Sequence, residues 1–235
     1  MELSNLLSIV IPCKNEGYVI DMLLDILNSQ KGIEDVNVIV SDSSDDGMTR
    51  ELLEERIHDK FNLYVITGGL PSKARNNGMS LVETPYVLFM DSDMFILDTN
   101  LLVDSVKLIN TQDFDLVTCK IRSTTGEYNY VYRVFDIIQR ISKIFSPFCL
   151  GGFMLFRVDT FKKLGGFDES IKVAEDYMIS KQIKRDKFKI HKSIVFTSPR
   201  RFQSKGLWYM LKLMIGSFFN KNNKKYFEED KDYWI

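Results

Sequence analysis

The arrangement of apolar segments along this chain constrains its fold more than any other feature. Each segment is four to six residues long and is separated from the next by a stretch long enough to form a helix. Such runs are typical of strands buried on both faces of a parallel sheet. Strands that alternate with helices predict right-handed crossovers and a mostly parallel, twisted α/β sheet with helices on both faces. The segments are Leu7–Pro12, Val36–Ser41, Leu63–Thr67, Tyr86–Met90 and Leu116–Cys119.

The helices between these strands are predicted from apolar periodicity and from capping residues. Ser72 and Asn100 are expected to cap the third and fourth helices, because serine and asparagine accept hydrogen bonds from free helix N–H groups. The expected helices are Val19–Leu27, Met48–Ile57, Ser72–Val82 and Asn100–Ile109.

After Cys119 the pattern changes. Residues 128–145 predict a helix whose packed face carries Val131, Phe135, Ile138, Ile141 and Phe145. A strand, a helix, a second strand and an apolar helix are expected to follow, at 150–158, 174–184, 189–196 and 207–219.

The chain has 235 residues, of which 45% are hydrophobic, so it can bury one full-sized core. We expect one domain over residues 1–205, and the change of pattern after Cys119 divides it at about residue 120. Residues 206–235 are expected to form an apolar and basic helix and tail packed on it. The three cysteines are far apart in sequence, which favours a reducing cytoplasm over a disulfide framework or a zinc cluster.

Charge is distributed unevenly, although the formal net charge is only −1. Residues 1–180 sum to about −10, whereas residues 181–225 sum to about +12. The basic region is either a solvated face or a contact for something anionic. The apolar run at 207–219 either packs on the core or docks on an anionic membrane. Lys212 interrupts this run, and it is too short to span a bilayer; no signal peptide is expected either.

Polar residues gather where the first two strands end. Pro12 is followed by Lys14, Asn15 and Glu16, with no G-x-G-x-x-G, which argues against a dinucleotide-binding dehydrogenase. Asp42 ends the second strand, where a carboxylate can accept a hydrogen bond from a base or a ribose. Asp45 and Asp46 are better explained as residues that cap the next helix.

The third and fourth strands are followed by charged groups of opposite sign. Lys73 and Arg75 lie near a predicted helix N-terminus and suggest an anion site, with a surface charge pair as the alternative. Asp91 and Asp93 follow the wholly apolar fourth strand. Two carboxylates so close together repel each other unless a cation lies between them, and oxygen ligands suit Mg²⁺ or Mn²⁺.

One more acidic pair, Glu175–Asp176, opens a predicted helix about 80 residues later. Helix N-termini favour negative charge, so capping is one explanation. The other is a general base that takes a proton from an acceptor hydroxyl.

Together these motifs resemble the family 2 glycosyltransferases over roughly residues 7–205. The residues that carry the resemblance are Ser8–Pro12 with Asn15–Glu16, Asp42 with Ser44 and Asp46, Ala74–Gly78, Asp91–Asp93, Gly151–Gly152 with Phe156–Arg157, and Glu175–Asp176.

The resemblance implies a GT-A type nucleotide-diphospho-sugar transferase fold and an inverting, single-displacement transfer. It implies that the turn from Pro12 to Glu16 and Asp42 hold the nucleobase, that Arg75 supports the base or the phosphates, and that Asp91 faces the ribose. Asp93, with Asp91 beside it, is expected to bind Mn²⁺ or Mg²⁺.

The resemblance also implies a nucleotide-binding half at about 1–120 and an acceptor half at about 121–205, and the remaining implied roles concern the acceptor half. Gly151 and Gly152 let the backbone approach the donor sugar or the acceptor, and Asp176 is the expected base, with Glu175 as the second candidate. The expected partners are a nucleotide sugar and a saccharide or lipid-linked acceptor, with peripheral membrane contact through the basic C-terminal region and no nucleic acid.

The sequence also departs from the family pattern. Ser41 stands where many members carry an acid, and Met48 stands near a usual Thr. The Q-x-x-R-W motif of processive synthases is missing, which favours a single addition. Arg200 and Arg201 occupy its place, and one of them is expected to reach the diphosphate.

Two other functional classes remain open at this point. A sugar-phosphate nucleotidyltransferase shares a nucleotide-binding core and a metal site, but it should begin with a Gly-rich loop that is absent after Pro12. A catalytically inactive module that binds anions or lipids would retain the fold and the basic C-terminal region.

Overall fold

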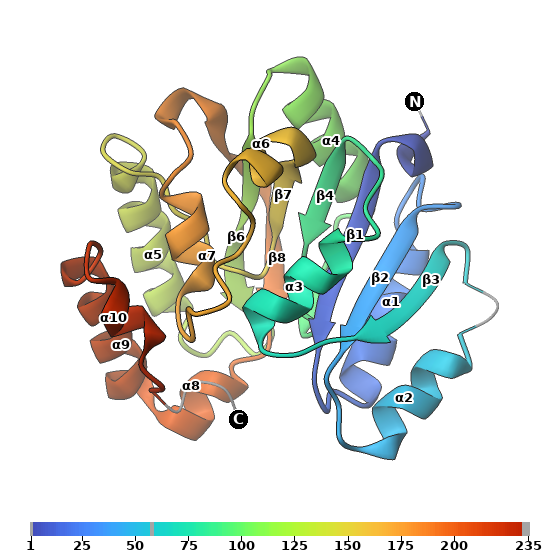
Figure 1. Cartoon of the computed structure of the whole chain (residues 1–235), viewed down its shortest axis with the longest axis horizontal. Helices are drawn as coiled ribbons and strands as arrows, with labels where there is room; N and C mark the ends of the chain where they lie inside the picture. The colour runs from blue at the N-terminus through green and yellow to red at the C-terminus, as the bar shows by residue number, and fades with distance from the viewer. Residues whose placement is uncertain (1, 57–58, 232–235) are drawn as a thin grey trace.

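The computed structural model describes residues 2–56 and 59–231. Within them the strands form one eight-stranded sheet in the order β3-β2-β1-β4-β7-β6-β8-β5. Figure 1 shows this twisted sheet with helices on both sides. The strands are β1 Leu7–Cys13, β2 Asn37–Asp42, β3 Asn62–Thr67, β4 Tyr86–Phe89, β5 Met94–Phe95, β6 Leu116–Ser123, β7 Met154–Arg157 and β8 Phe188–Thr197.

The first four long strands form the parallel half of the sheet. β1 pairs in parallel with both β2 and β4, and β2 pairs in parallel with β3. β7 is reversed and lies between β4 and β6, and β6 pairs in parallel with β8. β5 is antiparallel to β8 and was not predicted, since a strand of two residues has no periodicity to detect.

Ten α-helices connect and cover the strands in the described residues. They are α1 Tyr18–Asn28, α2 Gly47–Glu54, α3 Pro71–Met79, α4 Leu101–Thr111, α5 Asn129–Ser142, α6 Val158–Lys163, α7 Glu175–Ser180, α8 Arg200–Lys205, α9 Leu207–Phe219 and α10 Lys224–Glu228. The predicted second helix extended to Ile57, which lies outside the described residues.

Two hydrophobic clusters, one on each face of the sheet, form the core. Successive residues of β1 alternate between them: Ile9 and Ile11 belong to one cluster and Val10 to the other. Residues of α1, α4 and α5 contribute to the first cluster, and residues of α3, α6 and α7 to the second. The predicted α/β fold with helices on both faces is therefore confirmed.

Several local predictions were wrong, each for a physical reason. β3 is the edge strand and is largely half-buried or exposed, because nothing in the sheet covers its outer side. Ser72 does not cap α3; Leu70 is the N-cap, Pro71 opens the helix, and Ser72 is buried within it. Asn100 stands at the N-cap of α4, but its side chain makes no capping hydrogen bond. Asp46, in contrast, caps α2 as expected.

The packed face of α5 also differs from the prediction. Val131 is buried and Phe135 partly buried, whereas Ile138, Ile141 and Phe145 are exposed. Residues Val131, Tyr132, Phe135 and Gln139 face the sheet instead. The periodicity identified a helix with apolar stripes, but it did not indicate which stripe faces inward.

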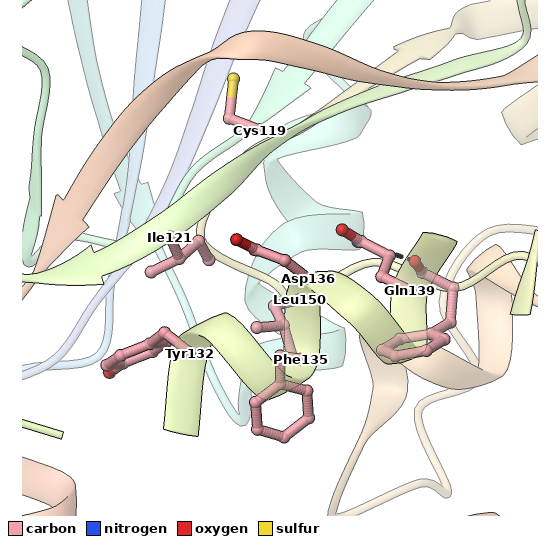
Figure 2. Close-up of a pocket in the computed structure, with 8 residues that line it drawn as sticks. Cys119, Ile121, Tyr132, Phe135, Asp136, Gln139 and Leu150 are labelled. Carbon is pink, nitrogen blue, oxygen red and sulfur yellow. Dashed lines mark hydrogen bonds between the residues drawn. The ribbon is translucent and has the colours of Figure 1, made fainter. Parts of the chain in front are cut away.

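A small cavity lies between β6 and the inner face of α5 (Figure 2). Its volume of about 10 Å³ leaves room for one water molecule at most. Gln139 beside it donates a hydrogen bond to the Phe148 carbonyl at 2.9 Å. The cavity is therefore a packing gap and too small for a substrate. It is lined by Cys119, Ile121, Tyr132, Phe135, Asp136, Gln139, Phe148 and Leu150.

The C-terminal helices close one side of the molecule. Met210 of α9 is buried in the main cluster, and Phe227 of α10 is fully buried against Ile171 and Val173. Helix α9 has the bounds predicted from sequence. In residues 2–56 and 59–231, we find no helix both long enough and apolar enough to cross a bilayer.

Candidate active site

The candidate site lies where the parallel strands end. Because β1, β2 and β4 run in the same direction, the turn after β1, Asp42 at the end of β2, and Asp91 and Asp93 after β4 all lie at one edge of the sheet. β7 runs the other way, so Gly151 and Gly152 precede it at this same edge. Segments from both halves of the chain therefore meet here.

Arg75 is at the centre of a buried charge group. Its guanidinium donates to Asp91 and to Glu175, each at 2.6 Å, and its side chain is 1% exposed. Although burial opposes its charge, Asp91 and Glu175 hold the pKa of Arg75 above its usual value. The guanidinium also lies over the ring of Phe167, 5.4 Å from its centroid. We call Arg75, Asp91 and Glu175 the Arg75 cluster.

Asp176 lies beside the Arg75 cluster and is fixed by backbone donors. The Gly151 N–H donates to its Oδ2 at 2.6 Å, and the Tyr177 N–H donates to its Oδ1 at 2.7 Å. A Cβ atom at Gly151 would lie 3.1 Å from the Arg75 Nη2, 3.5 Å from the Asp176 Oδ2 and 3.6 Å from the Asp91 Oδ2. Glycine at 151 therefore allows these three groups to converge on the backbone.

The electrostatic surroundings of Asp176 suit a proton acceptor. Burial, with the charge of Glu175 added to it, raises the pKa of Asp176 to about 7. Asp176 therefore accepts and releases a proton near neutral pH, which is the range in which a general base works best.

A second group of charged side chains, with a more exposed arginine, lies at the same edge of the sheet. Arg200 donates to both oxygens of Glu16, at 2.6 and 2.5 Å, and its Nε lies 3.6 Å from the Asp93 Oδ2. Its side chain is 47% exposed, in contrast to that of Arg75. Arg201 also acts electrostatically on Asp93. We call Arg200, Glu16 and Asp93 the Arg200 cluster.

Asp93 is the candidate cation ligand. Burial and the neighbouring charge of Asp91 raise its pKa to about 6, despite the two nearby arginines. A divalent cation would relieve this repulsion between the carboxylates. Among the described residues, no group of three or more His, Cys, Asp or Glu is arranged to hold a metal by itself. Mg²⁺ is often held by one or two carboxylates together with phosphate oxygens, so the pair fits such an ion.

The loops that follow β1 and β2 are tied together by Asn15. Its backbone N–H donates to the Ser44 Oγ, its amide donates to Asp45, and its side-chain oxygen accepts from the Asp45 and Asp46 N–H groups. Asp42 accepts from the Ser44 N–H at 3.0 Å. Glu16 and Asp42 both lie near Cys13. Burial and the charges of these two carboxylates therefore raise the pKa of the Cys13 thiol.

The loop after β3 is attached to the same region. The Ser43 hydroxyl accepts from the Gly69 N–H at 2.6 Å and donates to the Gly69 carbonyl at 2.8 Å. A Cβ at Gly68 would lie 2.2 Å from the Ser43 Oγ, so only glycine fits there. Three loops thus form a connected rim at the ends of β1, β2 and β3.

The structure brings most of the predicted residues to one edge but changes the position of Arg75 relative to expectation. Arg75 was expected to contact the base or the phosphates, whereas both of its amino groups are occupied by carboxylates below the surface. Lys73, two residues before Arg75 and beside Gly69, is exposed, as is Lys14. These lysines are therefore better placed for an anionic ligand than Arg75.

Aromatic residues near Asp93 were missed by the sequence reasoning. Burial and the charge of Asp93 raise the pKa of Tyr132 to about 12. Phe202 stacks on Tyr128 at 5.0 Å and meets Tyr132 edge-on at 5.7 Å. These residues come from α8 and from the start of α5, so no local motif could have connected them with the strand ends.

The comparisons with known proteins agree with this geometry. The family model described as "Glycosyl transferase family 2" matches residues 8–165. Validoxylamine A glucosyltransferase of Streptomyces hygroscopicus subsp. jinggangensis is 34% identical over 91 residues, which cover 37% of this chain and 22% of that protein. Poly(ribitol-phosphate) β-N-acetylglucosaminyltransferase TarS of Staphylococcus aureus is 27% identical over 124 residues, covering 51% and 21%. The matched segments thus span about a fifth of these relatives.

Solved structures resemble the whole chain. The mannosyltransferase PcManGT of Pyrobaculum calidifontis, in complex with GDP-Man and Mn²⁺, matches with a TM-score of 0.70 and 19% identity, over 96% of this chain and 65% of that one. S. aureus TarS in complex with UDP-GlcNAc matches with a TM-score of 0.64 and 20% identity, over 92% and 66%. These likenesses show that the fold is the expected GT-A type.

Proposed function

This chain belongs to glycosyl transferase family 2, and on that premise we propose that it moves a sugar from a nucleoside-diphosphate sugar to a hydroxyl acceptor, with Asp176 as the base. The observation that carries the proposal is the convergence of two carboxylates on the Gly151 backbone. The Oδ2 atoms of Asp176 and Asp91 lie 3.5 and 3.6 Å from the position that a Cβ atom on Gly151 would take. Burial raises the pKa of Asp176 to about 7. Asp91 adjoins Asp93, a candidate cation ligand.

The donor nucleotide is proposed to bind along the rim formed by the first three loops. Pro12, Asn15 and Asp42 lie there, and Lys14 and Lys73 are exposed beside it. Asp42 keeps one carboxylate oxygen beyond its hydrogen bond to Ser44, and this oxygen can accept from a base N–H group. Both UDP-sugars and GDP-sugars remain candidates, as complexes of the structural relatives contain one of each.

Asp93, assisted by Asp91, is proposed to hold Mn²⁺ or Mg²⁺ on the donor diphosphate. Bound there, the ion would neutralise the charge that grows on the leaving group. A structural relative was solved with Mn²⁺ and GDP-Man. Arg200 and Arg201 lie on the same side, and Arg200 can turn from Glu16 towards a phosphate because it is half exposed.

The transfer is proposed to be a single displacement with inversion. The acceptor oxygen bonds to the anomeric carbon while the bond from that carbon to the phosphate oxygen breaks, and the nucleoside diphosphate leaves with the electron pair. Asp176 takes the hydroxyl proton. The N–H groups of Gly151 and Tyr177 hold its carboxylate in place, so the base needs no reorientation during the reaction.

The acceptor is proposed to be a saccharide or a lipid-linked glycan, extended by one sugar in each reaction. Gly152 is explained by packing rather than by the acceptor, since a Cβ there would lie 2.7 Å from the sulfur of the buried Met94. We propose a cytoplasmic protein with peripheral membrane contact.

The test is a panel of UDP-sugars and GDP-sugars, each with and without Mn²⁺, read first as a shift in unfolding temperature. The donor that shifts it is then assayed for release of nucleoside diphosphate. We expect Asp93→Ala to abolish the metal-dependent part of both signals. Asp159→Ala is the matched control, because Asp159 is an exposed aspartate on α6, which begins at the opposite edge of the sheet.

Other outcomes would select another function. Release of pyrophosphate from a nucleoside triphosphate and a sugar phosphate would indicate a nucleotidyltransferase. Binding of the donor without turnover, unaffected by Asp93→Ala, would indicate an inactive binding module and overturn the proposal.

A further inference from the structure

The outer face of α5 is apolar although it faces away from the core. Tyr130, Val134, Ile137 and Ile141 recur at intervals of three and four residues, and each is more than half exposed. Ile144 and Phe145 extend this stripe beyond the helix, with Phe145 80% exposed. A surface helix of a soluble domain normally carries polar residues on this side. Helix α5 is therefore apolar on its outer face as well as towards the sheet.

Helix α9 has a similar stripe. Trp208, Lys212, Ile215 and Phe219 follow one another at helical spacing and face solvent, with Trp208 83% and Phe219 78% exposed. Phe218 flanks them. Only Met210 and Ser217 of this helix are buried among the described residues. The helix thus packs with one side and leaves large aromatic side chains on the other.

Contacts at both ends place the two helices on the same side of the molecule. Near their starts, Phe202, just before α9, stacks on Tyr128, just before α5. Near their ends, Lys181 accepts a hydrogen bond from Ser146 through its carbonyl and donates one to the Lys221 carbonyl through its Nζ. Figure 1 shows α5 and α9 together on this side. The exposed stripes of α5 and α9, from Tyr130 to Phe145 and from Trp208 to Phe219, are called the docking surface below.

Basic side chains surround the docking surface. Arg133 and Arg140 flank the stripe on α5, and Lys212 lies within the stripe on α9. Residues 205–225 contain five lysines and no acid. An open hollow beside Ile144 is lined by Arg140, Lys143, Arg185 and Asp186. Exposed aromatic and aliphatic groups next to such cations match the interface of a bilayer with anionic lipids.

From these contacts and charges we propose that the docking surface binds the face of an anionic phospholipid bilayer. A second copy of the chain fits this surface less well, since a two-fold dimer would place the basic surface against itself. A bilayer accepts both chemistries at once, because acyl chains take up the aromatic and aliphatic groups while phosphates neutralise the cations.

The docking surface adjoins the candidate site. Tyr128 and Tyr132, at the start of α5, lie between it and Asp93. If the proposed function holds, an acceptor hydroxyl carried on a membrane lipid would meet the donor at this boundary. The docking itself does not depend on the transfer, because binding to vesicles is measured without donor.

The experiment is co-sedimentation of the full chain with phosphatidylcholine vesicles, with and without phosphatidylglycerol. We expect binding only to the anionic vesicles, weakening as salt is raised. Trp208→Ala with Phe219→Ser should lower the vesicle affinity by roughly tenfold or more, since each large apolar side chain contributes on that scale. Leu97→Ser is the matched control, because Leu97 is 74% exposed and follows β5, outside the docking surface.

A second pair of variants tests the charge. Arg140→Gln with Lys212→Gln should weaken binding by roughly tenfold or more, at about 1 kcal/mol for each cation near the surface. Lys162→Gln with Lys163→Gln removes the same charge from α6 and should leave binding unchanged. Circular dichroism and unfolding temperature confirm that each variant is folded.

Four results would overturn the proposal. They are equal binding to neutral vesicles, no binding at all, unchanged binding of the Trp208 and Phe219 variant, and a dimer in light scattering that this variant converts to a monomer. The last would assign the surface to a second copy. Loss of sugar transfer with vesicle binding intact would count against the proposed function only.

Discussion

The two charge clusters at the strand ends contain the same kinds of side chain in opposite settings. In the Arg75 cluster the arginine side chain is 1% exposed, and its guanidinium is held between two carboxylates. In the Arg200 cluster the arginine side chain is 47% exposed, although it makes an equally short contact with Glu16. Burial makes the first arrangement costly to break, whereas solvent screens the second. The first therefore fixes the geometry of the site, and the second can rearrange around a ligand.

The largest expected effect is that of Arg75→Met. It leaves Asp91 and Glu175 without their cation, so the free energy of unfolding should fall by about 3–5 kcal/mol. Urea denaturation measures the change. Arg75→Lys retains the charge but not the forked geometry and should recover part of the loss. An unfolding midpoint unchanged in Arg75→Met would show that the cluster does not stabilise the fold.

Next in size is Asp176→Asn, which tests the proposed base separately from the neighbouring Arg75 cluster. Transfer should fall by roughly 10²–10⁴-fold, because the amide cannot take the acceptor proton. Steady-state kinetics and donor binding measure the two effects, and donor affinity should remain. Glu175→Gln is the comparison, since it should lower stability through Arg75 more than it lowers the rate. If Asp176→Asn transfers sugar normally, Asp176 is not the base.

The pH dependence should show two opposite trends from Asp176. Its pKa is raised from 3.8 to about 7, so kcat/KM should fall about tenfold per pH unit below that value. The folded chain also binds this proton more tightly than the unfolded chain. Its contribution to stability is therefore present at low pH and is lost as pH rises from 3.8 towards 7. Urea midpoints across this range should show that trend in the wild type and a weaker one in Asp176→Asn, where the raised pKa of Asp93 still contributes.

The smallest expected effect on stability is that of Arg200→Ala. A half-exposed ion pair contributes about 0–1 kcal/mol, so the unfolding midpoint should change little. The dissociation constant of the nucleoside diphosphate with Mn²⁺, measured by calorimetry, should rise roughly tenfold if a charged hydrogen bond is lost. A fall in stability as large as that of Arg75→Met would remove the distinction between the clusters.

The parts of the fold and site that depend on local pattern were predictable. Asp42, Asp91 and Asp93 follow apolar runs directly, and an apolar run that ends in acids marks a strand end whatever the rest of the chain does. The bounds of α9 followed in the same way from an apolar segment between Gly206 and Asn220 that only Lys212 interrupts with a charge.

The pairings between distant residues could not be predicted. Arg75 and Glu175 are 100 positions apart, and Glu16 and Arg200 are 184 apart. Each residue alone is compatible with a ligand contact or an ion pair, and only the folded chain decides between them. For the same reason the resemblance assigned Arg75 to the base or the phosphates and could not indicate its hydrogen bonds to Asp91 and Glu175.

The tether formed by Asn15 has a consequence for the energetics of donor recognition. Its three polar groups already join the loops after β1 and β2 in the free protein. The conformational entropy of ordering these loops is therefore lost when the chain folds, and little remains to be lost when a nucleobase arrives. Selectivity for the nucleobase should then depend on how well its shape and its hydrogen-bonding groups match loops that are already ordered.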